Sequence, residues 1–214
     1  MDPIIRPARE ADSELIAWVL QAAARSHLEV GIWDLAFPGP DEQRLAILAK
    51  LATTEQLHFA HYSRFLVAEV DGQPAAALSA YEASEFGGEK LSKGVAEVVI
   101  GLGWSGEEIT AMMDRIQPYS LLGYPNPDGL WIIEWVATRS EFRGRGLMNL
   151  LIVAILEQGR AAGFECSQIG HLLGNFPAQR TYEAAGFKRV DEYTHAAFEQ
   201  AFGSAGIARL QRDI

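Results

Sequence analysis

The stretch "LWIIEWVATRSEFRGRGLMNLLIVAILEQGRAAG" at residues 130–163 decides the fold, because a glycine- and arginine-rich loop joins two apolar segments. The first segment, "LWIIEWVAT", is apolar almost throughout, which is typical of a strand covered on both faces. The second, "LMNLLIVAILEQGRAAG", is apolar nearly all round, so it predicts a buried helix that ends at Gly163. The stretch therefore predicts a strand, a loop and a helix in that order.

The loop "SEFRGRG" at residues 140–146 combines features that suit an anionic ligand. Gly144 and Gly146 allow backbone conformations closed to other residues and let the main chain approach a ligand closely. The helix that follows offers unpaired N–H groups and a partial positive charge, which together suit a phosphate. Arg143 and Arg145 add charge-assisted donors. Taken by itself, the loop fits either a phosphate site or a surface turn with solvated arginines.

The residues that follow continue the alternation of strands and helices. "CSQIGHLL" predicts a second strand, and "KRVDEYTH" and "IARLQRDI" predict two closing strands. Between the second strand and the closing pair, Asn175 is a good N-cap for a helix over "FPAQRTYEAAG", with Gly186 at its C-terminal end. This part of the chain is expected to run strand, helix, strand, helix, strand and strand.

The N-terminal half gives fewer clear boundaries. We expect a short strand at residues 4–6, amphipathic helices at residues 9–28 and 41–61, and a hairpin about Asp71 and Gly72. The segments "GIWDLAFPGP" and "SEFGGEKLSKG" predict loops, the second of them mobile. Residues 95–127 are hard to assign, although "EEITAMMDRIQ" within them has helical spacing.

The composition limits the classes of function. The chain has 214 residues, enough for one domain with a substantial core, and its single cysteine, Cys166, cannot form an internal disulfide. It has no signal-peptide pattern and no apolar run of membrane-spanning length, so we expect a cytoplasmic protein without a membrane partner. The formal net charge of -10 argues against nucleic acid as a partner, because phosphate binding needs a basic surface.

Two motifs in the C-terminal part of the chain resemble those of the GCN5-related N-acetyltransferase (GNAT) family. The family's cofactor motif, Q/R-x-x-G-x-G/A, falls on residues 141–146, with both glycines in place and Glu141 where Gln or Arg is usual. Its second signature, Asn-x-x-Ala-x-x-x-Tyr, falls on Asn175, Ala178 and Tyr182. Two motifs in the expected order, on the expected strand, loop and helix contexts, make the resemblance specific.

The resemblance covers roughly residues 130–214 and implies an α/β (α+β) fold, in which helices flank a mixed, mostly antiparallel sheet. Two strands of that sheet would be splayed to admit the cosubstrate, acetyl-CoA. We expect a single N-acetyltransferase domain over residues 1–214, in which residues 1–129 supply the acceptor side and residues 130–214 bind acetyl-CoA. The resemblance implies no metal.

The same resemblance implies how acetyl-CoA binds. Its pyrophosphate would lie on the loop and helix start formed by Arg143, Gly144, Arg145, Gly146, Leu147 and Met148. Its pantetheine arm would pair with main-chain groups at Val136 and Thr138, where a backbone N–H would also polarise the thioester carbonyl. Asn175 would contact acetyl-CoA near the splayed strands.

Tyr182 and Glu134 are the implied catalytic residues. Tyr182 would act as the general acid toward the leaving thiolate, although it also fits a half-buried residue packed beside Phe187. The attacking primary amine, with a pKa of about 10.4, must lose a proton, and Glu134 is the leading base. The buried strand is expected to raise the pKa of Glu134, which fits equally well as a structural hydrogen-bond acceptor.

Other features have simpler explanations. "GLGWSG" at residues 101–106 matches the dinucleotide motif G-x-G-x-x-G, but no convincing strand with an acidic end follows, so we interpret it as a bend. His58 and His61 are three apart in a predicted helix, and without a third ligand we expect surface histidines rather than a metal site. Core packing is the default for four aromatic residues that would otherwise line an acceptor pocket, Trp18, Trp33, Phe37 and Trp104.

We therefore predict an enzyme that transfers an acetyl group from acetyl-CoA to a primary amine by direct attack in a ternary complex. The acceptor would be a small-molecule or peptide amine, and the resemblance makes a homodimer one option for the assembly. The alternative on the same fold is a non-catalytic sensor or interaction module that binds acetyl-CoA.

Overall fold

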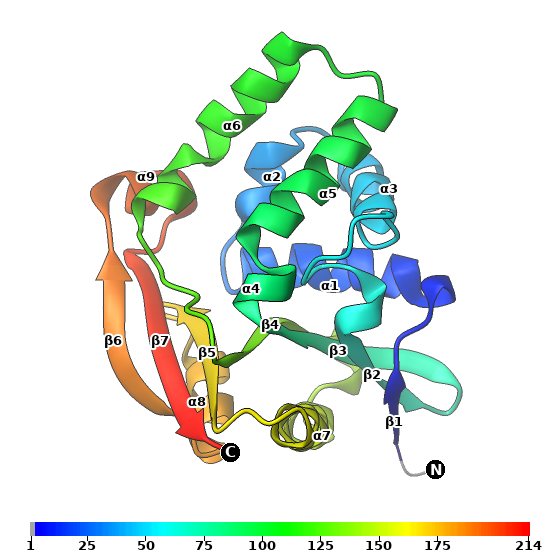
Figure 1. The fold of residues 1–214 in the computed structure, drawn as a ribbon, viewed down its shortest axis with the longest axis vertical. Helices are drawn as coiled ribbons and strands as arrows, with labels where there is room; N and C mark the ends of the chain where they lie inside the picture. The colour runs from blue at the N-terminus through cyan, green and yellow to red at the C-terminus, as the bar shows by residue number, and fades with distance from the viewer. Residues whose placement is uncertain (1–2) are drawn as a thin grey trace.

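The computed structural model describes residues 3–214, in which helices cover both faces of a central sheet (Figure 1). In that range the strands are β1 (Ile4–Pro7), β2 (Phe65–Val70), β3 (Gln73–Tyr81), β4 (Trp131–Thr138), β5 (Cys166–Leu172), β6 (Lys188–Thr194) and β7 (Gly206–Asp213). The α-helices are α1 (Ser13–Arg25), α2 (Ile32–Ala36), α3 (Asp41–Leu51), α4 (Ala83–Phe86), α5 (Gly88–Gly101), α6 (Gly106–Leu121), α7 (Leu147–Ala161), α8 (Phe176–Ala184) and α9 (Ala196–Phe202). None of the helices in residues 3–214 is long and apolar enough to cross a membrane.

The sheet is mixed and mostly antiparallel, as predicted. Over the described residues its strands pair in the order β1-β2-β3-β4-β5-β7-β6, and β4 with β5 is the one parallel pair. These two strands pair only from Trp131 opposite Ser167 to Ile133 opposite Ile169. Beyond that point they diverge, which confirms the expected splayed strands and leaves the second half of β4 without a partner on its β5 side.

Each face of the sheet has its own core. In β2, Phe65 and Val67 pack among the residues of α1 and α3, whereas Leu66 and Ala68 pack among those of α7. Figure 1 shows α1 and α7 on opposite sides of the central strands. Because successive side chains of a strand point to opposite faces, a strand covered on both faces has a nearly continuous apolar sequence.

The helix expected at residues 41–61 is shorter than predicted, because α3 ends at Leu51. The hydroxyl of Thr54 hydrogen-bonds to the carbonyl oxygens of Leu51, at 3.2 Å, and Gln56, at 2.9 Å. A threonine that binds nearby carbonyl groups competes with the helical backbone pattern. The residues after Thr54 therefore form a loop that leads into β2.

The first segment expected to be a loop contains α2. The carboxylate of Asp34 accepts a hydrogen bond from the backbone N–H of Gly31 at 2.8 Å and forms an ion pair with Arg25 at 2.6 Å. A half-buried carboxylate that satisfies the first turn stabilises a short helix that the local sequence alone does not favour.

The second segment expected to be a loop, "SEFGGEKLSKG", contains α4 and the start of α5. The helix α5 buries Val98 and Val99, and its Gly94 packs on His58 so closely that a β-carbon would lie 2.4 Å from the imidazole ring. The polar residues of the segment belong to the exposed faces of α4 and α5, so the prediction of a loop is wrong.

The helical spacing of "EEITAMMDRIQ" is confirmed by α6, whose N-terminus is capped by the Ser105 hydroxyl, an acceptor from the Glu108 N–H at 3.2 Å. The sequence did not predict α9, which begins after His195 and packs against α6. Figure 1 shows the end of α6 beside α9, above the ends of β5 and β7. This contact places residues of α6 and α9 close to the gap between the splayed strands.

Candidate active site

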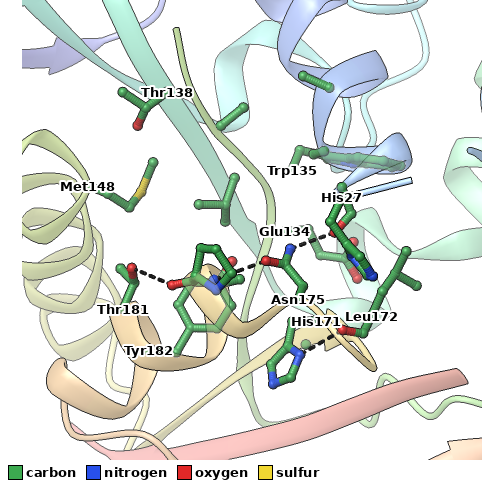
Figure 2. Close-up of a pocket in the computed structure, with 18 of the residues that line it drawn as sticks. His27, Glu134, Trp135, Thr138, Met148, His171, Leu172, Asn175, Thr181 and Tyr182 are labelled. Carbon is green, nitrogen blue, oxygen red and sulfur yellow. Dashed lines mark hydrogen bonds between the residues drawn. The ribbon is translucent and has the colours of Figure 1, made fainter. Parts of the chain in front are cut away.

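A cleft with a volume of about 940 Å³ lies where β4 and β5 diverge. The residues predicted for the site all line this cleft: Glu134, Val136, Thr138, Arg143, Gly144, Arg145, Gly146, Leu147, Met148, Asn175 and Tyr182. Figure 2 shows Glu134, Thr138, Met148, Asn175 and Tyr182 around the same space. The structure therefore brings together residues from β4, α7, α8 and the loops between them.

A β-bulge shapes β4 at the cleft. Ser79 pairs with Glu134 and Ala77 with Ala137, so a single β3 residue faces both Trp135 and Val136. Trp135 has a φ of 52°, in the left-handed region that non-glycine residues rarely adopt. The Ser79 hydroxyl donates to the carbonyl oxygen of Glu134 at 3.2 Å, which fixes the strand just before the bulge. Bulges redirect side chains and often lie beside functional sites.

The arginine–glycine loop presents a run of free amide groups to the cleft. Gly144 and Gly146 have φ values of 76° and 74°, so both need the left-handed conformation that glycine adopts without strain. Within residues 3–214, the backbone N–H groups of residues 144–149 have no hydrogen-bond acceptor. Since these amides lie at the start of α7, the loop and helix together provide donors and a partial positive charge for an anion.

The two arginines of the loop are held loosely. The Nε atom of Arg143 donates to the carbonyl oxygen of Thr138 at 3.3 Å, and the Arg145 guanidinium lies 5.3 Å from the Phe142 ring centre. Both side chains are exposed, so their donors can reach an anion on the loop amides.

Glu134 is half-buried at the floor of the cleft, among tyrosines. Burial raises the pKa of the carboxyl to about 7, although the nearby polar groups of Asn126 and Tyr81 favour the charged form. The Tyr81 side chain is buried beside this carboxyl, and burial and the Glu134 charge both raise the pKa of its phenol. A carboxyl group with a pKa near 7 exchanges protons readily at neutral pH.

Tyr182 both packs in the core and faces the cleft. Its side chain is 5% exposed and packs in the same core cluster as Phe187, and it also lines the cleft. Burial, helped by the charge of Glu134, raises the pKa of the Tyr182 phenol above its ordinary value. The phenol therefore keeps its proton at neutral pH and is available as a donor.

Asn175 joins two walls of the cleft. Its side-chain oxygen accepts from the Ala178 N–H at 3.1 Å, which confirms the predicted N-cap of α8. Its amide nitrogen donates to the Ser26 hydroxyl at 2.5 Å, just beyond the end of α1. Asn175 thereby ties the start of α8 to the α1 side of the cleft.

Several cleft residues were not predicted. Tyr119, Tyr124, Phe198 and Phe202 come from α6, the segment after it and α9. No sequence motif marks these residues. They reach the cleft because α6 packs on α9 and because of the order of the strands, and neither of these can be predicted from one segment of the sequence.

The histidines expected on a helix surface lie elsewhere. His58 and His61 are buried, with 0% and 5% exposure, in the segment between α3 and β2. The helix ends before them, and Thr54 hydrogen-bonds to Nε2 of His58 at 3.0 Å, so the imidazoles pack inside the protein. Within residues 3–214, no group of three or more His, Cys, Asp or Glu side chains is placed to hold a metal ion.

The remaining sequence features are explained by the fold and not by a binding site of their own. "GLGWSG" joins α5 to α6, so it lacks the preceding strand that a dinucleotide motif requires. Trp33 and Phe37 are buried in the core, with Trp104 packed against it, as the simpler interpretation had it. Trp18 packs against the same core but also lines the cleft.

Comparison with known proteins identifies the family. The model of the acetyltransferase (GNAT) family matches residues 29–187, which is more than half of the chain and extends well upstream of the two sequence motifs. The fold is similar to that of an acetyltransferase crystal structure (TM-score 0.71, 21% identity, 99% of both chains covered). It is also similar to an N-acetyltransferase from Staphylococcus aureus Mu50 (TM-score 0.71, 19% identity, 98% of this chain and 100% of that one). No curated protein sequence matches significantly. The chain belongs to the GNAT family of acetyltransferases.

Proposed function

We propose that this protein is an N-acetyltransferase that transfers an acetyl group from acetyl-CoA to a primary amine by direct attack. The observation that carries the proposal is the run of unpaired amides at residues 144–149, which opens into the same cleft as Glu134 and Tyr182. Acetyl-CoA is the cosubstrate typical of the family, and its pyrophosphate suits these amides while its extended arm suits the unpaired edge of β4.

The loop and β4 hold acetyl-CoA in this proposal. The amides of residues 144–149 bind its pyrophosphate, and Arg143 and Arg145 neutralise the phosphate charge from either side. The edge of β4 from Val136 to Thr138, which has no partner strand toward β5, pairs with the amides of the pantetheine arm. A free backbone N–H on this edge stabilises the negative charge that develops on the thioester oxygen.

Glu134 and Tyr182 handle the protons. Glu134, with its pKa raised to about 7, accepts a proton from the bound ammonium group, directly or through water, and leaves a neutral nucleophile. The Tyr182 phenol donates its proton to the sulfur atom of the departing thiolate. The amine nitrogen forms a bond to the acetyl carbon and loses its second proton as the carbon–sulfur bond breaks. That proton restores the Tyr182 phenol, directly or through water, so the products are an amide and free coenzyme A.

The test is the release of free thiol when the purified protein is mixed with acetyl-CoA and a panel of primary amines. Acetyl-CoA-dependent thiol release with at least one amine, and the matching acetylated product by mass spectrometry, are expected. Saturable acetyl-CoA binding without transfer to any amine would instead favour a non-catalytic acetyl-CoA sensor.

A further inference from the structure

The end of the cleft away from the arginine–glycine loop has an aromatic wall. Tyr119 from α6 and Phe198 and Phe202 from α9 line it, and their rings pack together. The ring centres lie 5.9 Å apart for Tyr119 and Phe198, 6.3 Å for Tyr119 and Phe202, and 4.6 Å for the two phenylalanines. Trp135, on the bulge of β4, also lines the cleft and carries a further ring.

Tyr124 completes this wall through a close approach to β5. A β-carbon on Gly170 would lie 2.6 Å from the Tyr124 hydroxyl, so only glycine at that position lets the ring lie over the strand. The Tyr124 ring is also 5.6 Å from that of Tyr193. The ring is therefore fixed from two sides, where it lines the cleft and also packs against the small core cluster that contains Phe198 and Phe202.

The positive and negative side chains of the cleft lie at different ends of it. Among the described residues that line it, Glu134 is the one carboxylate, and the two arginines, Arg143 and Arg145, belong to the phosphate-binding loop. Two histidines, His27 and His171, also line the cleft. The His171 ring lies 6.3 Å from that of Tyr182, and burial lowers its pKa, which keeps the imidazole neutral at pH 7. One negative charge surrounded by rings defines the acceptor end.

We propose that the acceptor is a primary amine with a single positive charge, carried on an aromatic or similarly large apolar body. The inference rests on the proposed function and specifies its substrate. The ammonium group lies at Glu134, and the body packs against Tyr119 and Tyr124, whose rings the buried phenylalanines of α9 support from behind. A polyamine would bury a second ammonium group without a carboxylate, and an amino acid would place its carboxylate near Glu134 without a cation.

Steady-state kinetics with chosen amines test the inference. We expect kcat/KM for 2-phenylethylamine to exceed those for spermidine, n-butylamine and L-phenylalanine by about tenfold or more. L-phenylalanine is the sharpest comparison, because it keeps the ring and the amine and adds only a carboxylate. A higher kcat/KM for spermidine or L-phenylalanine than for 2-phenylethylamine would overturn the inference and leave the transferase proposal standing.

A gain-of-function variant tests the charge argument separately. Tyr119→Glu adds a second carboxylate to the aromatic wall, and Tyr119→Gln is the matched uncharged control. We expect Tyr119→Glu to raise the spermidine to 2-phenylethylamine ratio of kcat/KM by about tenfold relative to Tyr119→Gln. An equal ratio in the two folded variants would contradict the assignment of the aromatic wall to the acceptor. If either variant fails to fold, the comparison of amines with the wild-type protein decides.

The two proposals fail in different ways. Protein that acetylates other primary amines but not 2-phenylethylamine would refute the inferred acceptor class alone. Protein that releases thiol with no amine, whether or not it binds acetyl-CoA, would refute the proposed function, and the inference with it.

Discussion

Glu134 is the residue on which the proposed chemistry depends most. Because the base must be deprotonated, kcat/KM should rise with pH up to a plateau above the pKa of about 7. Glu134→Gln keeps the size and removes the base, so we expect kcat/KM to fall about a hundredfold and the inflection near pH 7 to disappear. Rates measured from pH 5.5 to 9 check both, and an unchanged profile would exclude Glu134 as the base.

Tyr182 should matter for turnover and not for binding. Tyr182→Phe keeps the ring that packs in the core and removes only the proton donor, so kcat should fall by about tenfold or more. Calorimetry should give the same acetyl-CoA affinity for both proteins. Equal turnover at saturating substrates would leave Tyr182 a packing residue only, which its 5% exposure also fits.

At the scale of elements, the proposed function assigns the binding of acetyl-CoA to the loop between β4 and α7. Arg143→Ala removes one charged donor and leaves the free amides of residues 144–149 in place, so acetyl-CoA affinity should fall by roughly tenfold. Arg160→Ala, an exposed arginine at the other end of α7, is the control and should change nothing. Equal affinities for both variants by calorimetry would mean that Arg143 does not contact phosphate.

The elements that the sequence predicted well have strong local signals. β4 and α7 are long and apolar, and α8 begins at an asparagine whose side chain caps it. By contrast, α5 begins in a polar, glycine-rich segment, where Gly94 is the one buried residue of the helix, and its buried apolar side chains, Val98 and Val99, follow only later. α9 is a short helix whose stability comes from packing on α6, so nothing local distinguished it from a loop.

The candidate site also has parts that the sequence predicts and parts that it does not. The arginine–glycine loop and the Asn175 cap lie within single sequence motifs, which is why the sequence could predict their place at the cleft. Tyr119 and Phe198 are far apart in the chain and meet only after α6 and α9 pack together, so the acceptor end could not be predicted. The predicted surface position of His58 is wrong because the predicted helix continues to residue 61, whereas α3 ends at Leu51.

At the scale of the whole molecule, His58 links the stability of the fold to pH. Burial lowers the pKa of the imidazole from 6.5 to about 4, so the unfolded chain binds a proton in a range where the folded protein does not. Stability from this group is complete above pH 6.5 and is lost as pH falls toward 4. The free energy of unfolding should fall by about 3 kcal/mol over that range from this residue alone.

Urea denaturation at pH 7 and pH 4.5 checks this prediction. His58→Gln has no charge to bury, so its stability should change less between the two pH values than that of the native protein. His61 and His171, whose pKa values are also lowered by burial, contribute equally to both proteins. A pH dependence of the same size in the variant would show that other groups cause the acid sensitivity.

The whole molecule is arranged around one opening in its sheet. The parallel pairing of β4 and β5 stops at Ile133 and Ile169, and every predicted site residue lines the cleft that results. The two cores on either side of the sheet hold the diverging strands in place. Binding of acetyl-CoA in this opening is thus the central claim, and the chemistry and acceptor class depend on it.

Isothermal titration of the purified protein with acetyl-CoA, with NAD as a parallel control, tests that claim most directly. We expect saturable binding of acetyl-CoA at one site per chain and no heat above dilution with NAD. Absence of acetyl-CoA binding, or equal binding of both ligands, would contradict the assignment of the loop at residues 144–149 as the site for the coenzyme A pyrophosphate.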